Sequence, residues 1–205
     1  MSTPSDSIAA LEKEIWEKTA RLNHLRRQTA DDGGPAVADY SFATLTGPLR
    51  LSDLFAGHDT LLAIHNMGQG CRHCTLWADG LNGLLPHLET AMSVVLLSKD
   101  DPHTQQRFAH ERGWRFRLAS HGGGAYIREQ AIQPGHDNYP GCVVYRRDGA
   151  AIRRRHAAAF GENDLFCPAW HLLAMAGRGE DDWHPQFSYW RRPDAMDDGG
   201  ANLPD

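Results

Sequence analysis

The feature that most constrains the fold is an alternation of strand-like and helix-like segments through the middle of the chain. Residues 60–67 and 92–98 are apolar runs of strand length, and helical segments follow them at 71–88 and 100–113. Asp101 followed by Pro102 is typical of a helix start. Residues 114–118 predict a further short strand. Strands separated by helices form βαβ units with parallel strands, so we expect an α/β fold.

Two hairpins are expected on either side of this core. Residues 40–51 alternate around Gly47-Pro48, and residues 142–145 and 150–154 are separated by Asp148-Gly149, a dipeptide typical of hairpin turns. One helical turn at 52–55 follows the first hairpin, and a last helix is expected from Pro168 to about Gly177. The predicted architecture is a central mixed sheet flanked by helices, with an N-terminal helix and a β-hairpin extension.

The N-terminal helix is predicted from Ser5-Asp6, which can cap it, to about Gln28. Its apolar residues recur every three or four positions, and Lys18 interrupts the stripe where a strict heptad requires an apolar residue. We favour packing of this helix against the domain, because the stripe is short for a self-sufficient coiled coil; a helix that joins two copies into a homodimer is the alternative. The stripe consists of Ile8, Leu11, Ile15, Leu22 and Leu25.

The chain is expected to divide into three parts. Residues 1–34 would hold the N-terminal helix and a linker, residues 35–180 the α/β domain, and residues 181–205 a C-terminal extension. Residues 194–205 are acidic and lack aromatic side chains, so this end is predicted to be disordered.

Charge and hydropathy exclude several classes of partner. The net charge is −5, from 21 basic and 26 acidic residues, whereas nucleic-acid surfaces need clustered positive charge. No segment approaches the roughly 20 apolar residues that span a bilayer. A basic segment followed by an apolar one, typical of secretory signals, is not visible at the N-terminus. We therefore expect a cytoplasmic protein that binds neither nucleic acid nor membrane.

The four cysteines, at positions 71, 74, 142 and 167, include one close pair. Stable disulfides are rare in a reducing compartment, so such a pair indicates redox catalysis or metal binding. Cys71 falls at the expected helix N-terminus, where unpaired N–H groups and the helix dipole favour a thiolate. Arg72 and His73 add neighbouring positive charge.

This arrangement predicts a thiol–disulfide oxidoreductase. Cys71 would attack a disulfide in a protein or a small-thiol compound, and Cys74 would resolve the mixed disulfide. A thiol reductant would complete the cycle, and we expect no cofactor. His73 would stabilise the reduced thiolate and make the pair more oxidising than thioredoxin, whose potential is about −270 mV.

Other residues have two interpretations each. His65 lies six residues before Cys71 and is either a base for the resolving cysteine or a hydrogen-bonded core histidine. A zinc site is the alternative use of the dithiol, with Cys142, His65 or His73 as further ligands, although the spacing matches no standard zinc module. Cys142 and Cys167 are predicted to be buried, inert thiols. Trp170, Trp183 and Trp190 are candidates to cover the active-site face.

The strand–Cys71-Arg72-His73-Cys74–helix unit, with Tyr139-Pro140 before a strand, resembles the thioredoxin superfamily. More narrowly, the chain resembles an uncharacterised bacterial thioredoxin-like family of predicted dithiol-disulfide oxidoreductases with peroxiredoxin-like architecture. The matching runs are Leu51-Ser52-Asp53-Leu54-Phe55, His65-Asn66-Met67, Cys74-Thr75-Leu76-Trp77-Ala78-Asp79-Gly80, Gly113-Trp114-Arg115-Phe116 and Arg147-Asp148-Gly149.

This resemblance implies the thioredoxin-like fold and a cis-proline facing the dithiol. Pro140 is the candidate for that proline, with Pro134 as the alternative. A peroxiredoxin-type thiol peroxidase is the second candidate function, suggested by the N-terminal hairpin. The residues before Cys71 lack the Pro-x-x-x-Thr-x-x-Cys loop of that class, so peroxide chemistry is the weaker choice. A non-catalytic module that binds a metal or a partner through the dithiol face is the third.

Overall fold

The computed structural model describes residues 3–29, 33–179 and 181–186, and the chain divides into two units, Met1–Pro35 and Ala36–Asp205. The first unit contains α1 (Pro4–Gln28), so the predicted helix is confirmed. Its cap is Thr3, not Ser5-Asp6, because Thr3 and Asp6 form a reciprocal capping box and Pro4 takes the first helical position. Trp190 and the predicted disordered end lie outside the described residues.

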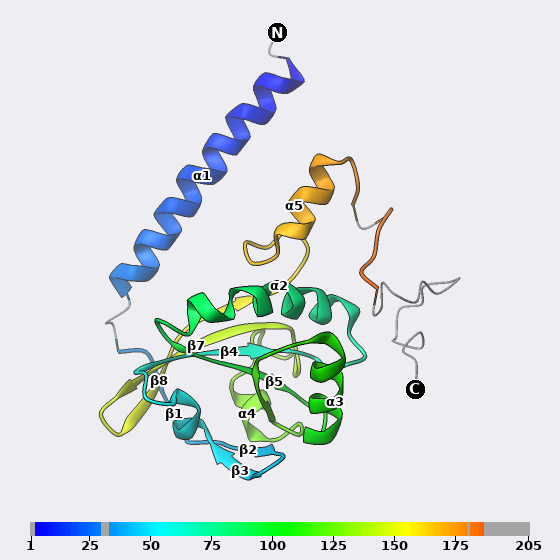
Figure 1. The fold of residues 1–205 in the computed structure, drawn as a ribbon. Helices are drawn as coiled ribbons and strands as arrows, with labels where there is room; N and C mark the ends of the chain where they lie inside the picture. The colour runs from blue at the N-terminus through cyan, green and yellow to red at the C-terminus, as the bar shows by residue number, and fades with distance from the viewer. Residues whose placement is uncertain (1–2, 30–32, 180, 187–205) are drawn as a thin grey trace. The chain divides into compact units, whose positions relative to one another are not determined.

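The second unit is built on one mixed sheet of eight strands in the order β1-β8-β7-β4-β5-β6-β2-β3. Strands β4, β5 and β6 are parallel, and the remaining neighbours pair antiparallel. The expected mixed α/β architecture is therefore confirmed (Figure 1). The strands are β1 (Ala36–Val37), β2 (Ser41–Thr44), β3 (Gly47–Arg50), β4 (Thr60–His65), β5 (Ser93–Ser98), β6 (Arg117–Ser120), β7 (Gly141–Asp148) and β8 (Ala151–Ala159).

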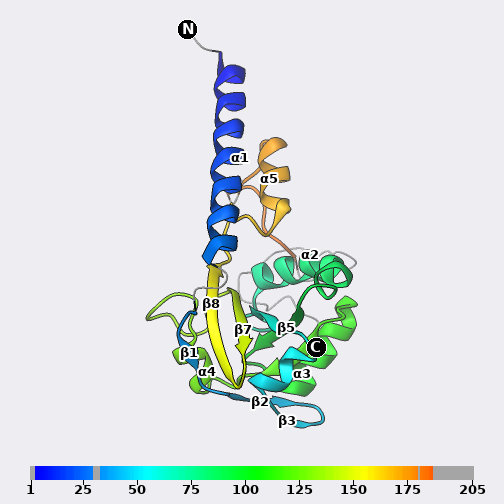
Figure 2. The ribbon, with the colours of Figure 1, turned by 90° about the vertical axis from the view of Figure 1, so that its left-hand side faces the viewer.

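Helices cover both faces of this sheet. Figures 1 and 2 show α2 and α4 on opposite sides of the central strands. The helical elements of the second unit are the 3-10 helix η2 (Leu51–Phe55), α2 (Arg72–Leu88), α3 (Pro102–Arg112), α4 (Ala125–Glu129) and α5 (Pro168–Met175). Among the described residues, none of the helices combines the length and apolar character that a membrane span requires.

Strand alternation divides the apolar core into two clusters. The buried side chains of β4 alternate, with Leu61 and Ala63 in one cluster and Ile64 in the other. The first cluster includes Tyr126 and Ile127 of α4, and the second includes residues of α2 and α5. The dithiol helix and the tyrosine-rich cluster therefore belong to opposite faces.

Three local elements differ from the sequence predictions. The first hairpin turns at Leu45 and Thr46, because Thr44 pairs with Gly47, and Pro48 is accommodated on the outermost strand β3. The strand expected at 114–118 begins only at Arg117, since the preceding residues are tied to α2 by side-chain hydrogen bonds. The short elements β1 and α4 carried too little pattern to be predicted.

Candidate active site

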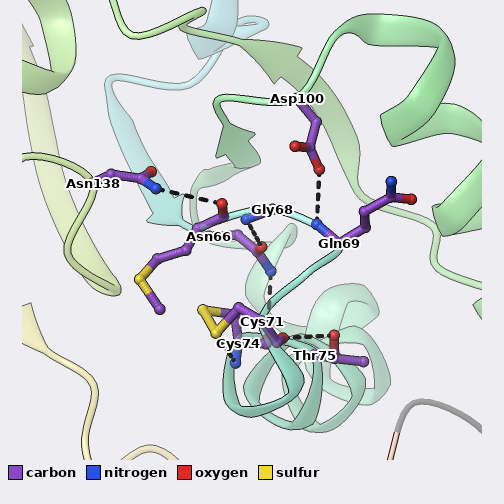
Figure 3. The surroundings of a disulfide bond; sticks show 9 residues. Asn66, Gly68, Gln69, Cys71, Cys74, Thr75, Asp100 and Asn138 are labelled. Atoms are coloured by element: carbon purple, nitrogen blue, oxygen red, sulfur yellow. Dashed lines mark hydrogen bonds between the residues drawn. A yellow bond between two sulfur atoms is a disulfide. The ribbon is translucent and has the colours of Figure 1, made fainter. Parts of the chain in front are cut away.

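The dithiol lies where β4 ends and α2 begins. Cys71 is the N-cap residue of α2, and its sulfur forms a disulfide with Cys74 (Figure 3). The Cys74 backbone N–H donates to Cys71 Sγ at 3.1 Å, so one of the unpaired N–H groups of the helix is directed at this sulfur. Cys71 is partly exposed, whereas Cys74 is only 3% exposed. The two sulfurs are therefore unequal in access.

Three polar side chains hold the loop that carries Cys71. Asn66 Oδ1 accepts the Gly68 N–H at 2.8 Å, and its amide nitrogen donates to the Cys74 carbonyl at 3.4 Å. Asp100 accepts the Gln69 N–H at 2.7 Å, and the Asn138 amide donates to the Met67 carbonyl at 3.4 Å (Figure 3). These bonds link the ends of β4, β5 and the 130–140 loop around the dithiol.

Gly68 is required at its position for two reasons. Its φ of +113° is a conformation that side-chain-bearing residues rarely adopt. A Cβ there would also lie 2.7 Å from Asp100 Oδ1. Asp100 can thus approach the loop only because residue 68 is glycine.

His73 lies among aromatic rings on the first turn of α2. Its ring stacks on Trp170 at a centroid distance of 6.0 Å and 21° between planes, and Trp77 lies 6.3 Å away. His184 makes an edge contact at 6.4 Å. Trp170 in turn meets Trp183 at 5.8 Å. Trp170 and Trp183 therefore lie close to the helix turn that carries the dithiol.

The Trp-Ala-Asp-Gly run after the dithiol works as a structural tie. Trp77 Nε1 donates to Asp164 Oδ2 at 2.7 Å, and Trp77 is buried. Asp79 accepts from Trp114 Nε1 at 2.7 Å and forms an ion pair with Arg112 through two hydrogen bonds. The run thus fixes α2 to α3, to the segment before β6 and to the loop before α5.

His65 does not reach the dithiol through its hydrogen bonds. Its Nε2 contacts the Tyr126 hydroxyl at 2.7 Å, on the face opposite α2. The Tyr126 hydroxyl also accepts from Tyr145 at 3.1 Å. The chain of hydrogen bonds continues through Gln130 to the hydroxyl of Tyr40. This arrangement favours the core-histidine interpretation of His65 over the catalytic base.

Burial controls titration on this face. Desolvation lowers the pKa of His65 to about 3 and that of His121 to about 4. Nearby positive charge acts in the same direction, from Arg154 on His65 and from Lys99 on His121. Desolvation likewise raises the pKa of Tyr126 well above its ordinary value. Both histidines are therefore neutral at physiological pH.

The prediction of a cis-proline at Pro140 is wrong, because none of the described residues has a cis peptide bond. The same holds for Pro134. Two residues before Pro140, Asn138 has a φ of +63°, and its amide donates to the Met67 carbonyl. The Pro140 carbonyl accepts the Phe160 N–H at 3.0 Å, so this residue begins the pairing of β7 with β8.

The remaining cysteines are buried and form no disulfide. Cys142 lies on β7 in the α2-face cluster, and burial raises the pKa of the Cys167 thiol at the start of α5. Within the described ranges, no three His, Cys, Asp or Glu side chains come together as a metal-binding group. The ligand set considered for zinc is thus not assembled by these residues.

A family model matches residues 4–196, which is almost the whole chain. The chain belongs to the DUF899 family. This family is described as bacterial proteins of unknown function. Comparison with curated protein sequences gave no match.

Solved structures show the same fold as this DUF899 chain. Peroxidoxin BcpB from Mycobacterium tuberculosis is 22% identical, with a TM-score of 0.53, and the match covers 70% of this chain and 94% of that one. A cysteine-to-serine mutant of PrxQ from Xylella fastidiosa is 14% identical, with a TM-score of 0.54 and coverage of 71% and 97%. The DUF899 chain therefore has a thioredoxin-like fold.

The polar residues around the dithiol of this DUF899 chain were not predicted from its sequence. Asn66 and Asp100 closely follow parallel strands, and such positions converge at one sheet edge, so this rule could have found them. Asn138 and Asp164 come from irregular segments far along the chain. No local sequence pattern predicts their contacts with Met67 and Trp77.

Proposed function

We propose that the protein is a thiol–disulfide oxidoreductase in which Cys71 attacks and Cys74 resolves. The observation that carries the proposal is the inequality of the two sulfurs. Cys71 is partly exposed and caps α2, whereas Cys74 is buried inside the first turn. Substrate can therefore approach Cys71, while Cys74 is shielded from solvent and lies within bonding reach of the Cys71 sulfur.

The atoms and electrons of this reaction cycle balance without a cofactor. The Cys71 thiolate attacks one sulfur of a substrate disulfide, forms a mixed disulfide and releases the other substrate sulfur as a thiolate. Cys74, after losing its proton, attacks Cys71 Sγ, forms the Cys71–Cys74 disulfide and releases the second substrate thiolate. The substrate gains two electrons and the protein loses two. A dithiol reductant restores the reduced pair by the reverse exchange.

His73 is the proposed tuning residue of this reaction. It follows Cys71 by two positions, and its imidazole lies against Trp170 and Trp77. A protonated imidazole gains a cation–π contact from such rings and favours a thiolate on the same helical turn. These effects stabilise the reduced form, so we propose that His73 raises the reduction potential.

The test is insulin reduction with dithiothreitol as the electron donor. We expect catalysis by the wild-type protein and a rate at the uncatalysed background for Cys71→Ser. Cys142→Ser is the matched control, because Cys142 is a buried cysteine outside the dithiol. Equal rates for wild type and Cys71→Ser would overturn the proposal.

Peroxide reduction is the second candidate, favoured by the hairpin β2–β3 that precedes the thioredoxin-like core. The attacking thiolate would then be oxidised to a sulfenic acid by the peroxide, and Cys74 would condense with it and release water. Consumption of hydrogen peroxide that requires Cys71 and exceeds the insulin rate would favour this function over disulfide exchange.

A further inference from the structure

The apolar face of α1 is exposed along the helix. No residue of α1 is buried, and the helix carries both a capping box and a Thr29 hydroxyl bonded to the Leu25 carbonyl at its end. Five large apolar side chains of one stripe are between 38% and 59% exposed: Ile8, Leu11, Ile15, Leu22 and Leu25. Such an amphipathic helix is stabilised when its apolar stripe is covered.

The spacing of the stripe is that of a coiled coil. Positions 8, 11, 15, 18, 22 and 25 alternate in steps of three and four, which places them at the core positions of successive heptads. Lys18 is the polar exception. Its Nζ pairs with Glu14 Oε1 at 2.6 Å, so the ammonium is drawn to the flank of the stripe while the aliphatic stem can remain on it.

Charge along α1 is divided between its two halves. The half from residue 4 to 17 has four acidic residues and one basic residue, and the half from 18 to 28 has four basic residues and no acidic one. Parallel pairing of two such helices would place like charges together. Antiparallel pairing would place each acidic half against a basic half. The acidic residues are Asp6, Glu12, Glu14 and Glu17, and the basic residues of the second half are Lys18, Arg21, Arg26 and Arg27.

We propose that α1 pairs antiparallel with α1 of a second copy of this chain. In this register Leu11 packs against the partner's Leu22, and Ile8 against the partner's Leu25. Glu14 flanks the stripe beside the partner's Arg21, and symmetry repeats the contact, so each dimer gains two such pairs. In a parallel dimer the flanking position would instead bring Arg21 against the partner's Arg26, which is repulsive.

The first experiment measures the mass of the full chain by sedimentation velocity over a range of concentrations, with the thiols kept reduced. We expect a wild-type dimer and a Leu22→Lys monomer. Trp16→Gln is the matched control, because Trp16 is 72% exposed and lies outside the stripe, so this variant should remain a dimer. A wild-type monomer throughout the range would overturn the proposal, as would dimerisation of Leu22→Lys equal to wild type.

The second experiment tests the antiparallel direction by charge reversal. Glu14→Arg and Arg21→Glu should each weaken the dimer about ten-fold, since two attractive pairs become repulsive, and the double variant should recover most of that loss. A tighter dimer for Arg21→Glu alone would indicate parallel pairing and contradict the proposal. Two further results would also contradict it: a monomer whose α1 resists proteolysis, as expected if the helix covers its own domain, and a monomer that binds phosphatidylserine vesicles through α1.

Discussion

The two faces of the sheet differ at the edge where β4 ends. On the α2 face, the end of β4 leads to a partly exposed sulfur, a histidine among tryptophans and a loop held by Asn66 and Asp100. On the opposite face, His65 ends the same strand but is buried in a chain of tyrosine hydrogen bonds. Cys71 follows His65 by six positions, yet the two lie in different environments, because His65 ends β4 with its side chain on the face opposite α2 and Cys71 caps α2. One face carries the dithiol, and the other carries a buried chain of hydrogen bonds.

The largest expected effect separates the two faces by activity. Cys71→Ser should abolish disulfide reductase turnover, a loss of several orders of magnitude, because no other described cysteine is both partly exposed and at a helix N-terminus. His65→Gln should retain activity within a factor of about two, since its hydrogen bond lies on the other face. Initial rates of insulin reduction measure both. A loss of activity in His65→Gln comparable to that of Cys71→Ser would remove the distinction.

Acid should reveal the tyrosine face through stability. The folded-state pKa of His65, about 3, lies below the ordinary value of 6.5, so the unfolded chain binds the extra proton first. Stability is therefore full above pH 6.5 and falls as the pH drops toward 3, by about 1.4 kcal/mol per pH unit for this group. Urea unfolding at pH 7.5, 6 and 5 measures the slope, which His65→Gln should reduce. An identical slope in the variant would show that groups other than His65 cause the pH dependence of stability.

Removal of one hydroxyl should weaken the same face more modestly. Tyr126→Phe keeps the ring but deprives His65 and Tyr145 of a buried partner. The free energy of unfolding should fall by about 1–3 kcal/mol, the cost of unsatisfied buried polar groups. The dithiol potential should not change, because the hydroxyl lies on the face away from α2. Chemical denaturation and a glutathione redox titration provide the two readouts, and a shift of the potential would show coupling between the faces.

The smallest expected effect lies within the α2 face. His73→Phe preserves an aromatic ring against Trp170 but removes the titratable nitrogen. We expect the reduction potential to fall by about 30 mV, which corresponds to a change of about 1.4 kcal/mol for a two-electron couple. The wild-type potential should lie above the roughly −270 mV of thioredoxin. A wild-type value near that of thioredoxin, unchanged in His73→Phe, would exclude the tuning role.

Local sequence pattern was sufficient for the core of the fold. The parallel strands β4 and β5, the capped helix α3 and the hairpin at Asp148-Gly149 all follow from short-range periodicity, capping and turn chemistry. The dithiol position also follows, because a strand, a glycine turn and a helix surround it. These features depend on residues that are neighbours in the chain.

The long-range contacts around the dithiol could not be predicted in the same way. Trp170 contacts His73 across almost a hundred residues, and Asp164 reaches Trp77 from an irregular loop. The direction of the His65 side chain depends on the register of β4, because a shift of one residue would turn the side chain to the other face of the sheet. The positive φ of Asn138 before β7 was likewise not marked by any local sequence pattern.

The most direct test of the central claim is the site of glutathione attachment. Reduced Cys74→Ser and Cys71→Ser proteins are each mixed with oxidised glutathione, and the adduct is located by peptide mass spectrometry. We predict rapid attachment to Cys71 in the Cys74→Ser variant and little attachment to the buried Cys74 in the Cys71→Ser variant. Equal rates at the two cysteines, or attachment to Cys142 or Cys167 instead, would contradict it.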